Sequence, residues 1–569
     1  MTAPYLAQFD STAWRRPLVV QTLTIILIGL ASALLLMLAI RDIRVDVPAI
    51  GVFALVFGAL TAILLKGMKK VAVFPLLCAI VALGWLWPRF IGSGSGGFYT
   101  SLQLPVLLER GLFTQDFSFH LAIVESIKHF GYPSTAIHGI PYEPYHFGGH
   151  YFLALVSLLS GIPAMELLPY QATYLAALAI CFFFLYRSIG SNGGILAPVA
   201  IALFFLVDRL ESFFWVFDIS TPIALLFGFL LLTRIEEKQN VLLESLLLFL
   251  TLFAKISAGV YVWAIYLIYC VFRQELTPIR KFYAFAGAAA ALVLAMALVS
   301  SDATRSASLH LEFDNLRRQL LAHGNREPKV LLFLLFPALV AIVAVIKRDL
   351  KLACAAVAVT AISFLAMNVS FVNRANMHFI NAGNWMAAFL LAGVKIEWHG
   401  KYRRHFPAVA LAVLALYCMP DFMKKSSIIT DTLSAFPQRT DANAYIDKLG
   451  ELRKRKGNFL IYIPEQETDF WNHWAYEGDY SSRYFMPFWI PMISGKPAFL
   501  GYNPIKMENT KVGGYAPGTY GYAVYYGNAN PCAKFDRLLK LTKFGDAIRE
   551  ESLSCQATYD ALERHRLGR

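Results

Sequence analysis

Long apolar runs dominate this chain and decide its fold class. Of its 569 residues, 57% are hydrophobic and 16% are charged, a balance that is too apolar for a soluble protein of this size. Runs of roughly 15 to 24 apolar residues recur, and in hydrocarbon a helix is the only open-ended element that satisfies its own backbone hydrogen bonds. The sequence therefore predicts an all-α polytopic membrane bundle.

About thirteen transmembrane helices are expected, and the basic residues between them indicate an orientation. The spans are predicted near 17–40, 47–65, 71–88, 168–187, 193–208, 219–233, 241–254, 258–272, 282–300, 328–346, 352–368, 379–395 and 406–420. Lysine and arginine are enriched in cytoplasmic loops. With a cytoplasmic N-terminus, KGMKK at 66–70, the pair Arg273 and Lys281, and KRDLK at 347–351 all fall inside. The net charge of +13 follows from this topology, so nucleic acid is not an expected partner.

The chain divides into two predicted domains. Residues 1–420 form the transmembrane domain, with a long outer loop at about 89–165, and residues 425–569 form a small extracytoplasmic α/β domain. In this tail, GNFLIYIPEQ and GKPAFLGY resemble short strands, while NAYIDKLGELRKRK and YDALERHRL have helical patterns. Cys532 and Cys555 form a disulfide if the tail lies in an oxidising compartment and their geometry permits one. A bacterial inner membrane is the expected location.

The outer loop contains two predicted surface helices with an unusual set of polar residues. The segment 116–150 reads DFSFHLAIVESIKHFGYPSTAIHGIPYEPYHFGGH and holds one aspartate and five histidines. After Asp116 the apolar residues follow helical spacing, and Gly131 with Pro133 supplies a stop. A second helix is predicted to begin near His146. Both helices are expected to lie along the membrane surface.

Asp116 is the strongest candidate for a general base. Asp116 and His120 are four residues apart and share a helix face, as do His146 and His150, so the two pairs are predicted to converge. A carboxylate beside imidazoles at a lipid–water boundary is suited to proton transfer. The alternative interpretation is that Asp116 caps the helix it begins, and that the histidines are ordinary interfacial residues.

The same segment raises the question of a metal. HFGGH resembles a two-histidine metal face, which Asp116 would complete as a divalent site. No further ligand is identifiable in the sequence, so no metal site is predicted, although a divalent cation remains an open alternative. Glu143, just before the second helix, is expected to contact substrate.

Basic residues at the predicted outer face are suited to binding a phosphate. The loop SFVNRANMHFINAGNW offers Asn373, Arg374 and His378 beside a span, and arginine is suited to bidentate phosphate contact. Lys255 lies at the predicted outer end of another span. The alternatives are a lipid headgroup contact or helix cap for this loop, and a lysine that merely snorkels to the interface.

These features together resemble the GT-C superfamily of integral membrane glycosyltransferases, which includes protein O-mannosyltransferases and the lipid A aminoarabinose transferase. The shared features are an acidic residue in the first long outer loop of the core bundle, two surface helices around it, many spans and an outer C-terminal domain. DFSFHLAIVESIKHFGYP followed by YHFGGHYFLA is also similar to bacterial members, in which an Asp-x-x-x-His helix precedes a Tyr-His-x-Gly-x-His helix.

The resemblance implies an inverting transfer of a sugar from a polyprenyl phosphate to an acceptor, which is a glycan, a lipid or a protein. Asp116 would activate the acceptor hydroxyl, Arg374 and Lys255 would hold the donor phosphate, and His120, His146 and His150 would line the site. The sequence departs from family members with paired acids, because the site reads Asp-Phe-Ser. A metal-dependent mechanism is therefore not implied.

Two other classes of protein compete with an enzyme. A secondary transporter or lipid flippase usually shows internal repeats and polar sites near the bilayer midplane, whereas the charged residues here cluster at the predicted outer surface. A non-enzymatic protein that assembles envelope polysaccharide would explain the tail, but it would leave the aspartate and histidine cluster without a role.

Overall fold

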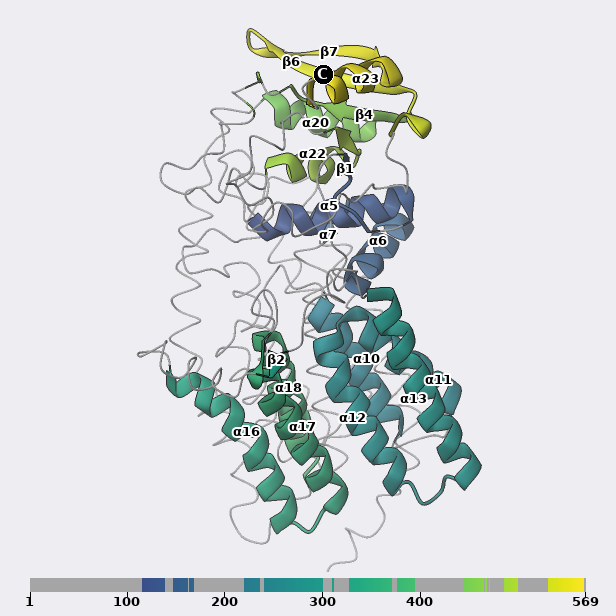
Figure 1. The fold of residues 1–569 in the computed structure, drawn as a ribbon, viewed down its shortest axis with the longest axis vertical. Helices are drawn as coiled ribbons and strands as arrows, with labels where there is room; N and C mark the ends of the chain where they lie inside the picture. Colours follow the sequence, from purple (N-terminus) through teal and green to yellow (C-terminus); the bar gives the residue numbers. More distant parts are fainter. Residues whose placement is uncertain are drawn as a thin grey trace, which may run out of the picture.

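The structure is a computed structural model. It describes residues 115–138, 147–167, 220–235, 240–299, 310–311, 327–370, 376–394, 444–499 and 531–566, apart from 132, 162, 465, 468–469 and 471–485. Figure 1 shows three layers: a bundle of helices, a small sheet with its own helices, and between them the helices α5 to α7.

Seven apolar helices of the bundle lie within the described residues, and each confirms a predicted helical segment. They are α10 (Ser220–Ile235), α11 (Val241–Ala254), α12 (Ile256–Phe272), α13 (Pro278–Val299), α16 (Glu327–Ile346), α17 (Leu350–Asn368) and α18 (Asn376–Ala392). The six other predicted spans, near 17–40, 47–65, 71–88, 168–187, 193–208 and 406–420, lie outside the described residues. The total of thirteen helices therefore stays a prediction.

The helices of the bundle differ in whether they are long enough to cross a membrane. Within the part of the chain that the structure describes, Pro278–Leu298 of α13 is long and apolar enough to be a candidate span, and six further apolar helices are shorter. A span needs about 20 apolar residues when it runs straight across the bilayer. By length and composition, α13 is thus the clearest membrane helix of the described bundle.

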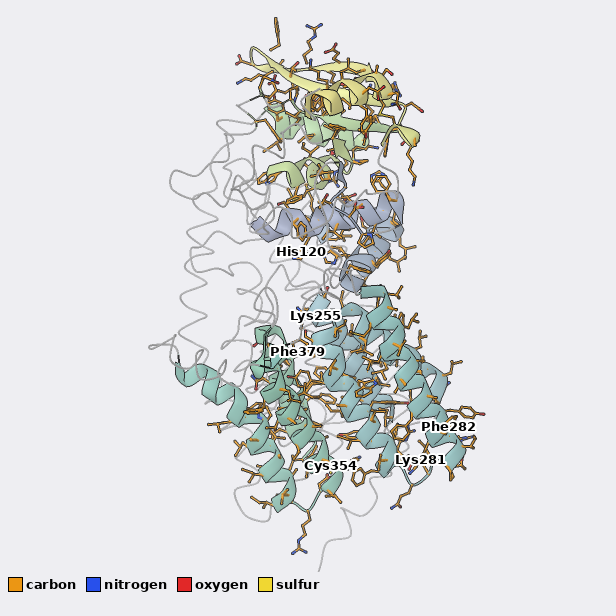
Figure 2. All side chains as sticks on the ribbon, in the orientation of Figure 1. His120, Lys255, Lys281, Phe282, Cys354 and Phe379 are labelled. Carbon is orange, nitrogen blue, oxygen red and sulfur yellow. A yellow bond between two sulfur atoms is a disulfide. The ribbon has the colours of Figure 1, made fainter. Side chains whose placement is uncertain are left out.

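The two ends of the bundle carry different residues. In Figure 2, Lys281 and Cys354 lie at one end, whereas Lys255 and Phe379 lie at the other end, close to α5. Lys281 belongs to a predicted cytoplasmic loop, and the residues before Cys354 form another. This separation agrees with the predicted alternation of basic loops, while the side of the membrane that each end faces stays a prediction.

The helices α5 (Gln115–Phe130) and α6 (Gly148–Ser160) confirm the two helices predicted in the outer loop. Gly131 ends α5 and Gly161 ends α6, with φ of 80° and 70°, the left-handed conformation that glycine adopts most readily. The residues of α5 from 121 to 127 are all buried, so this helix is not a surface helix with one wet face. It is covered on both sides, because the C-terminal region packs on the side away from the bundle.

The C-terminal region is an α/β unit built on a five-stranded sheet with the order β1-β5-β4-β6-β7. The elements β4 (Phe459–Tyr462), β5 (Ala498–Phe499), α20 (Ala444–Lys454) and α23 (Cys555–Arg566) confirm the predicted strands and helices. The sequence analysis missed α22 (Met486–Ser494) and the antiparallel hairpin of β6 (Arg537–Phe544) and β7 (Ala547–Ser554). Strands β4, β5 and β6 run parallel to one another.

The edge strand β1 (Ile137–His138) comes from the predicted outer loop, whereas the other four strands come from the tail. It pairs parallel to β5, with Ile137 opposite Ala498 and His138 opposite Phe499. The backbone N–H of Ala498 also donates to the carbonyl of Ala136 at 2.9 Å. The predicted loop at 89–165 and the predicted domain at 425–569 therefore contribute strands to one sheet.

Cys532 and Cys555 form a disulfide, which confirms the pairing that the sequence left open. The bond joins the short 3-10 helix at Pro531–Ala533 to the first residue of α23, and so fixes α23 beside the sheet. Disulfides persist in oxidising compartments. The bond thus agrees with the predicted extracytoplasmic position of this region.

An ion-pair cluster joins α20 to β7 and leads to a prediction for acid pH. Burial alone would raise the pKa of the Glu550 carboxyl, but Lys448 and Arg455, each 2.5 Å away, outweigh this effect and hold the pKa below its usual range. A lowered carboxyl pKa stabilises the folded state above the unfolded-state pKa, and this stabilisation is lost as the pH falls through the folded-state pKa.

We therefore expect Glu550→Gln to cost less than about 1 kcal/mol at neutral pH, because the pairs are partly exposed. The difference in free energy of unfolding between the variant and the original chain should shrink as the pH falls below about 4.3, the usual pKa of a glutamate carboxyl. Hydrogen exchange of the α20 and β7 amides across this pH range measures it. A difference that does not change with pH would contradict the assignment.

Candidate functional site

The first turn of α5 carries Asp116, the predicted general base. The helix begins at Gln115, so Asp116 is its second residue, and His120 follows one turn later. A carboxylate in a first helical turn is stabilised by the helix dipole and by backbone N–H groups that have no partner within the helix. The helical position of Asp116 is therefore as predicted, and its side chain lies outside the described part of the structure.

His120 and His150 are joined by a hydrogen bond between their imidazole rings. Nδ1 of His120 lies 2.9 Å from Nε2 of His150. His150 is 1% exposed, and His120 is half-buried. One ring must donate an N–H to a bare nitrogen of the other, so at least one of the two imidazoles is neutral. The predicted convergence of the two helices of the outer loop is confirmed for this pair of histidines.

A close backbone contact fixes α6 against the bundle. A Cβ added to Gly148 would lie 2.6 Å from the Cα of Ala254 and 2.7 Å from the carbonyl oxygen of Phe253. Gly148 opens α6 two residues before His150, and Ala254 ends α11 one residue before Lys255. The missing side chain of Gly148 thus lets the turn that holds His150 reach the corner that holds Lys255. The sequence analysis did not identify this glycine.

Lys255 occupies the corner between two bundle helices. It is the single residue between α11 and α12, with an extended backbone, and the backbone N–H of Gly259 donates to its carbonyl at 2.9 Å. Its side chain is 3% exposed. A snorkelling lysine keeps its ammonium in water, so that interpretation is wrong for Lys255. A buried ammonium is costly unless polar or negatively charged groups contact it.

The predicted polar loop near residue 380 is mostly a helix. The helix α18 begins at Asn376, so His378 and Asn384 lie within it, and Asn384 is 1% exposed. Figure 2 shows Phe379, on the first turn of α18, at the same end of the bundle as Lys255. Before α18, Val369–Ser370 pairs with His310–Leu311, which lies between the predicted spans 282–300 and 328–346.

The other end of the bundle holds an ion pair that the sequence analysis did not anticipate. Arg273 was expected to be a topological charge of a cytoplasmic loop, but it is 6% exposed and its Nη1 donates to both carboxylate oxygens of Glu244 at 3.1 and 3.0 Å. The Tyr266 hydroxyl donates to the same carboxylate at 3.2 Å. This cluster joins α11 to α12 at the end away from α5, so it lies apart from the candidate site.

The structure places some of the predicted site residues and leaves others outside its described part. His120, His150 and Lys255 have described side chains. Figure 2 shows His120 on α5 and Lys255 at the end of the bundle nearest to α5, and His150 contacts His120. Asp116 and His378 are placed by their helices alone. Glu143, His146, Asn373 and Arg374 lie outside the described residues. The described residues hold no group of three or more histidine, cysteine, aspartate or glutamate side chains arranged for a metal.

Comparisons with known proteins give little further guidance. No family model matches the chain, and no curated protein matches it. Among solved structures, the apo form of the Archaeoglobus fulgidus oligosaccharyltransferase is similar over 82% of this chain and 69% of that chain, at 12% sequence identity and a TM-score of 0.35. A similarity at that TM-score carries no conclusion about a shared fold or a shared activity.

Proposed function

We propose that this chain is a membrane glycosyltransferase that moves a sugar from a polyprenyl-phosphate donor to an acceptor hydroxyl at the outer face of a cytoplasmic membrane. One observation carries the proposal. The His120–His150 pair lies one turn from Asp116, and the contact of Gly148 with Ala254 brings this pair to the corner that buries Lys255. The helix turns that carry Asp116, His120 and His150 therefore lie next to the end of the bundle at which Lys255 is buried.

The proposed reaction is a single displacement at the anomeric carbon. The Asp116 carboxylate accepts the proton of the acceptor hydroxyl as the oxygen attacks, a bond forms between that oxygen and the anomeric carbon, and the bond from this carbon to the phosphate oxygen breaks. The electron pair of the broken bond leaves with the polyprenyl phosphate. Attack from the opposite face inverts the configuration at the anomeric carbon.

In this proposal the imidazole pair positions the groups that take part in the proton transfer to Asp116. His120 lies one turn from Asp116 on the same face of α5, and its hydrogen bond to the buried His150 restrains the imidazole ring. A ring held in one tautomer presents a fixed donor or acceptor to a neighbouring carboxylate or hydroxyl. Glu143 and His146 belong to the same loop, and we assign them to contacts with the acceptor or the sugar.

Cationic residues hold the leaving phosphate in this proposal. Lys255 is buried at the corner of α11 and α12, and Arg374 with Asn373 precedes α18, which starts at the same end of the bundle. Positive groups placed around a departing phosphate stabilise its developing charge. They are expected to do this without a metal, although a divalent cation is the alternative.

Membrane placement supports this assignment of roles. Lys281, from one predicted cytoplasmic loop, lies at the end of the bundle away from the site, as does Cys354, which follows the predicted loop KRDLK at 347–351. The disulfide lies in the C-terminal region, on the other side of α5. By the positive-inside rule, the site end is then extracytoplasmic. A donor whose lipid tail stays in the bilayer reaches this end with its sugar at the outer surface.

Lys255→Met is expected to raise the KM for the donor by about tenfold, because the loss of a charged hydrogen bond costs about 1.5 kcal/mol. The matched control is Lys281→Met, at the opposite end of the bundle, where the ammonium donates to the carbonyl of Val271. Steady-state kinetics with a fixed acceptor gives both values. The phosphate role fails if the two variants have the same donor KM.

The test of the proposed function is a transfer assay with the purified full chain in liposomes. Radiolabelled sugars on polyprenyl phosphate are supplied with a lipid-linked glycan, a cell-wall polymer or a protein as acceptor, and nucleotide sugars serve as control donors. The expected result is labelled acceptor together with free polyprenyl phosphate. If a labelled compound instead crosses the vesicle membrane chemically unchanged, the chain is a transporter and the proposal is overturned.

A further inference from the structure

The C-terminal region packs against α5, the helix that carries Asp116 and His120, on the side away from the bundle. The ring of Phe119, which precedes His120, packs edge-on against the ring of Phe488 in α22, with centroids 5.3 Å apart. Both rings are buried. Further along α5, the ring of His129 hydrogen-bonds the carbonyl of Gly495, directly after α22. Two points a few turns apart thus fix both the position and the rotation of α5.

Hydrogen bonds and strand pairing fix the turn that follows α5. The hydroxyls of Ser126 and Ser134 are 2.6 Å apart and buried, and the Ser134 hydroxyl accepts the backbone N–H of Ala136 at 3.1 Å. Ala136 has a φ of 55°, an uncommon conformation for alanine that its surroundings must maintain. The chain then enters β1 and pairs with β5. The C-terminal end of α5 is therefore anchored in the sheet of the tail.

The helix α22 is itself fixed to the rest of the C-terminal region. Arg453 of α20 donates from Nε to the carbonyl of Ile493 at 2.6 Å and from Nη2 to the carbonyl of Met492, so it caps the C-terminal end of α22. The chain of contacts runs from α20 to α22 and from α22 to α5. A displacement of α22 would consequently reach the turn of α5 that carries His120.

From these contacts we infer that the C-terminal domain is a positioning element of the active site, and that Phe488 is a positioning residue for Asp116 and His120. The inference rests on the proposed function and deepens it, because it assigns the tail a part in the transfer step. Phe488 touches α5 within one turn of both residues through Phe119. Misplacement of a reacting group by about 1 Å can cost on the order of 100-fold in rate.

The test compares two changes of one aromatic ring within the same domain. Phe488→Ala removes the ring that contacts α5, and Phe488→Leu keeps part of its volume. The control is Phe544→Ala, because Phe544 is the last residue of β6 and its ring is 76% exposed. All variants are made in the full chain. Transfer kinetics and hydrogen exchange of the α5 amides are measured for each.

We expect Phe488→Ala to lower kcat by about tenfold or more, with a smaller change in the donor KM, and Phe488→Leu to retain most of the activity. The α5 amides should exchange faster in Phe488→Ala and at the original rate in Phe544→Ala. If α5 exchange stays unchanged in Phe488→Ala, or if kcat falls equally in Phe544→Ala, the positioning role is overturned. If α5 exchange rises while the original chain transfers no sugar, the proposed function fails and the structural coupling stands.

Discussion

Replacement of Asp116 by asparagine is expected to abolish sugar transfer and to leave the protein folded. Asparagine has nearly the same shape as aspartate, but its amide does not accept the proton of an attacking hydroxyl. Loss of a general base typically lowers a rate by about 10²- to 10⁴-fold. The measurement is kcat in the liposome assay, together with thermal unfolding, and Asp116→Glu should recover part of the activity.

This change also separates catalysis from helix capping. Asparagine caps a helix about as well as aspartate, so a purely capping Asp116 predicts little effect on either activity or stability. The control is Asp447→Asn, because Asp447 lies in the first turn of α20, which is outside the candidate site. Full transfer activity in Asp116→Asn would remove Asp116 from the role of base.

The second large effect is expected for Gly148→Ala. The new Cβ would lie 2.6 to 2.8 Å from the backbone atoms of Phe253 and Ala254. Backbone atoms cannot move aside as the end of a flexible side chain can, so α6 must shift away from the corner of α11 and α12. Overpacking of this kind costs about 3 kcal/mol. The shift would also separate His150 from the Lys255 corner, so transfer activity should fall together with the midpoint of unfolding.

The same substitution elsewhere supplies the control. A Cβ added to Gly450, in α20, meets no atom within 4 Å. Alanine is preferred to glycine within a helix by about 1 kcal/mol, so Gly450→Ala should leave activity unchanged and raise stability slightly. An unfolding midpoint for Gly148→Ala as high as that of Gly450→Ala would show that α6 does not depend on the close contact.

The sequence predicted the elements whose signal is local and missed those that depend on distant partners. The bundle helices follow from apolar runs, and α5 and α6 follow from helical spacing with glycine stops. The hairpin of β6 and β7 was not predicted, because charged residues interrupt the apolar pattern of both strands. The strands read RLLKLTKF and AIREESLS and are partly exposed. The helix α22 contains Pro491, which argues against a helix in any local pattern.

In the candidate site, too, features with a local sequence signal were predicted, and features that depend on distant partners were not. The convergence of His120 with His150 followed from two helices whose polar residues share a face, and the structure confirms it. The burial of Lys255 did not follow, because the sequence gives no sign that α11 turns into α12 at a single residue. Gly148 was overlooked as well. Its signal is the pair of glycines at the start of an otherwise bulky helix, which becomes informative only once the partner backbone is known.

The pairing of β1 with β5 sets an order for biosynthesis. Ile137 and Ala498 lie about 360 residues apart, so β1 leaves the ribosome long before its partner exists. Contacts at such separation form late. The helix α5 therefore lacks its contacts with the C-terminal region until that region has been synthesised. A nascent or truncated chain would lack the contacts that hold α5, and under the proposed function we expect transfer activity only when synthesis of the chain is finished.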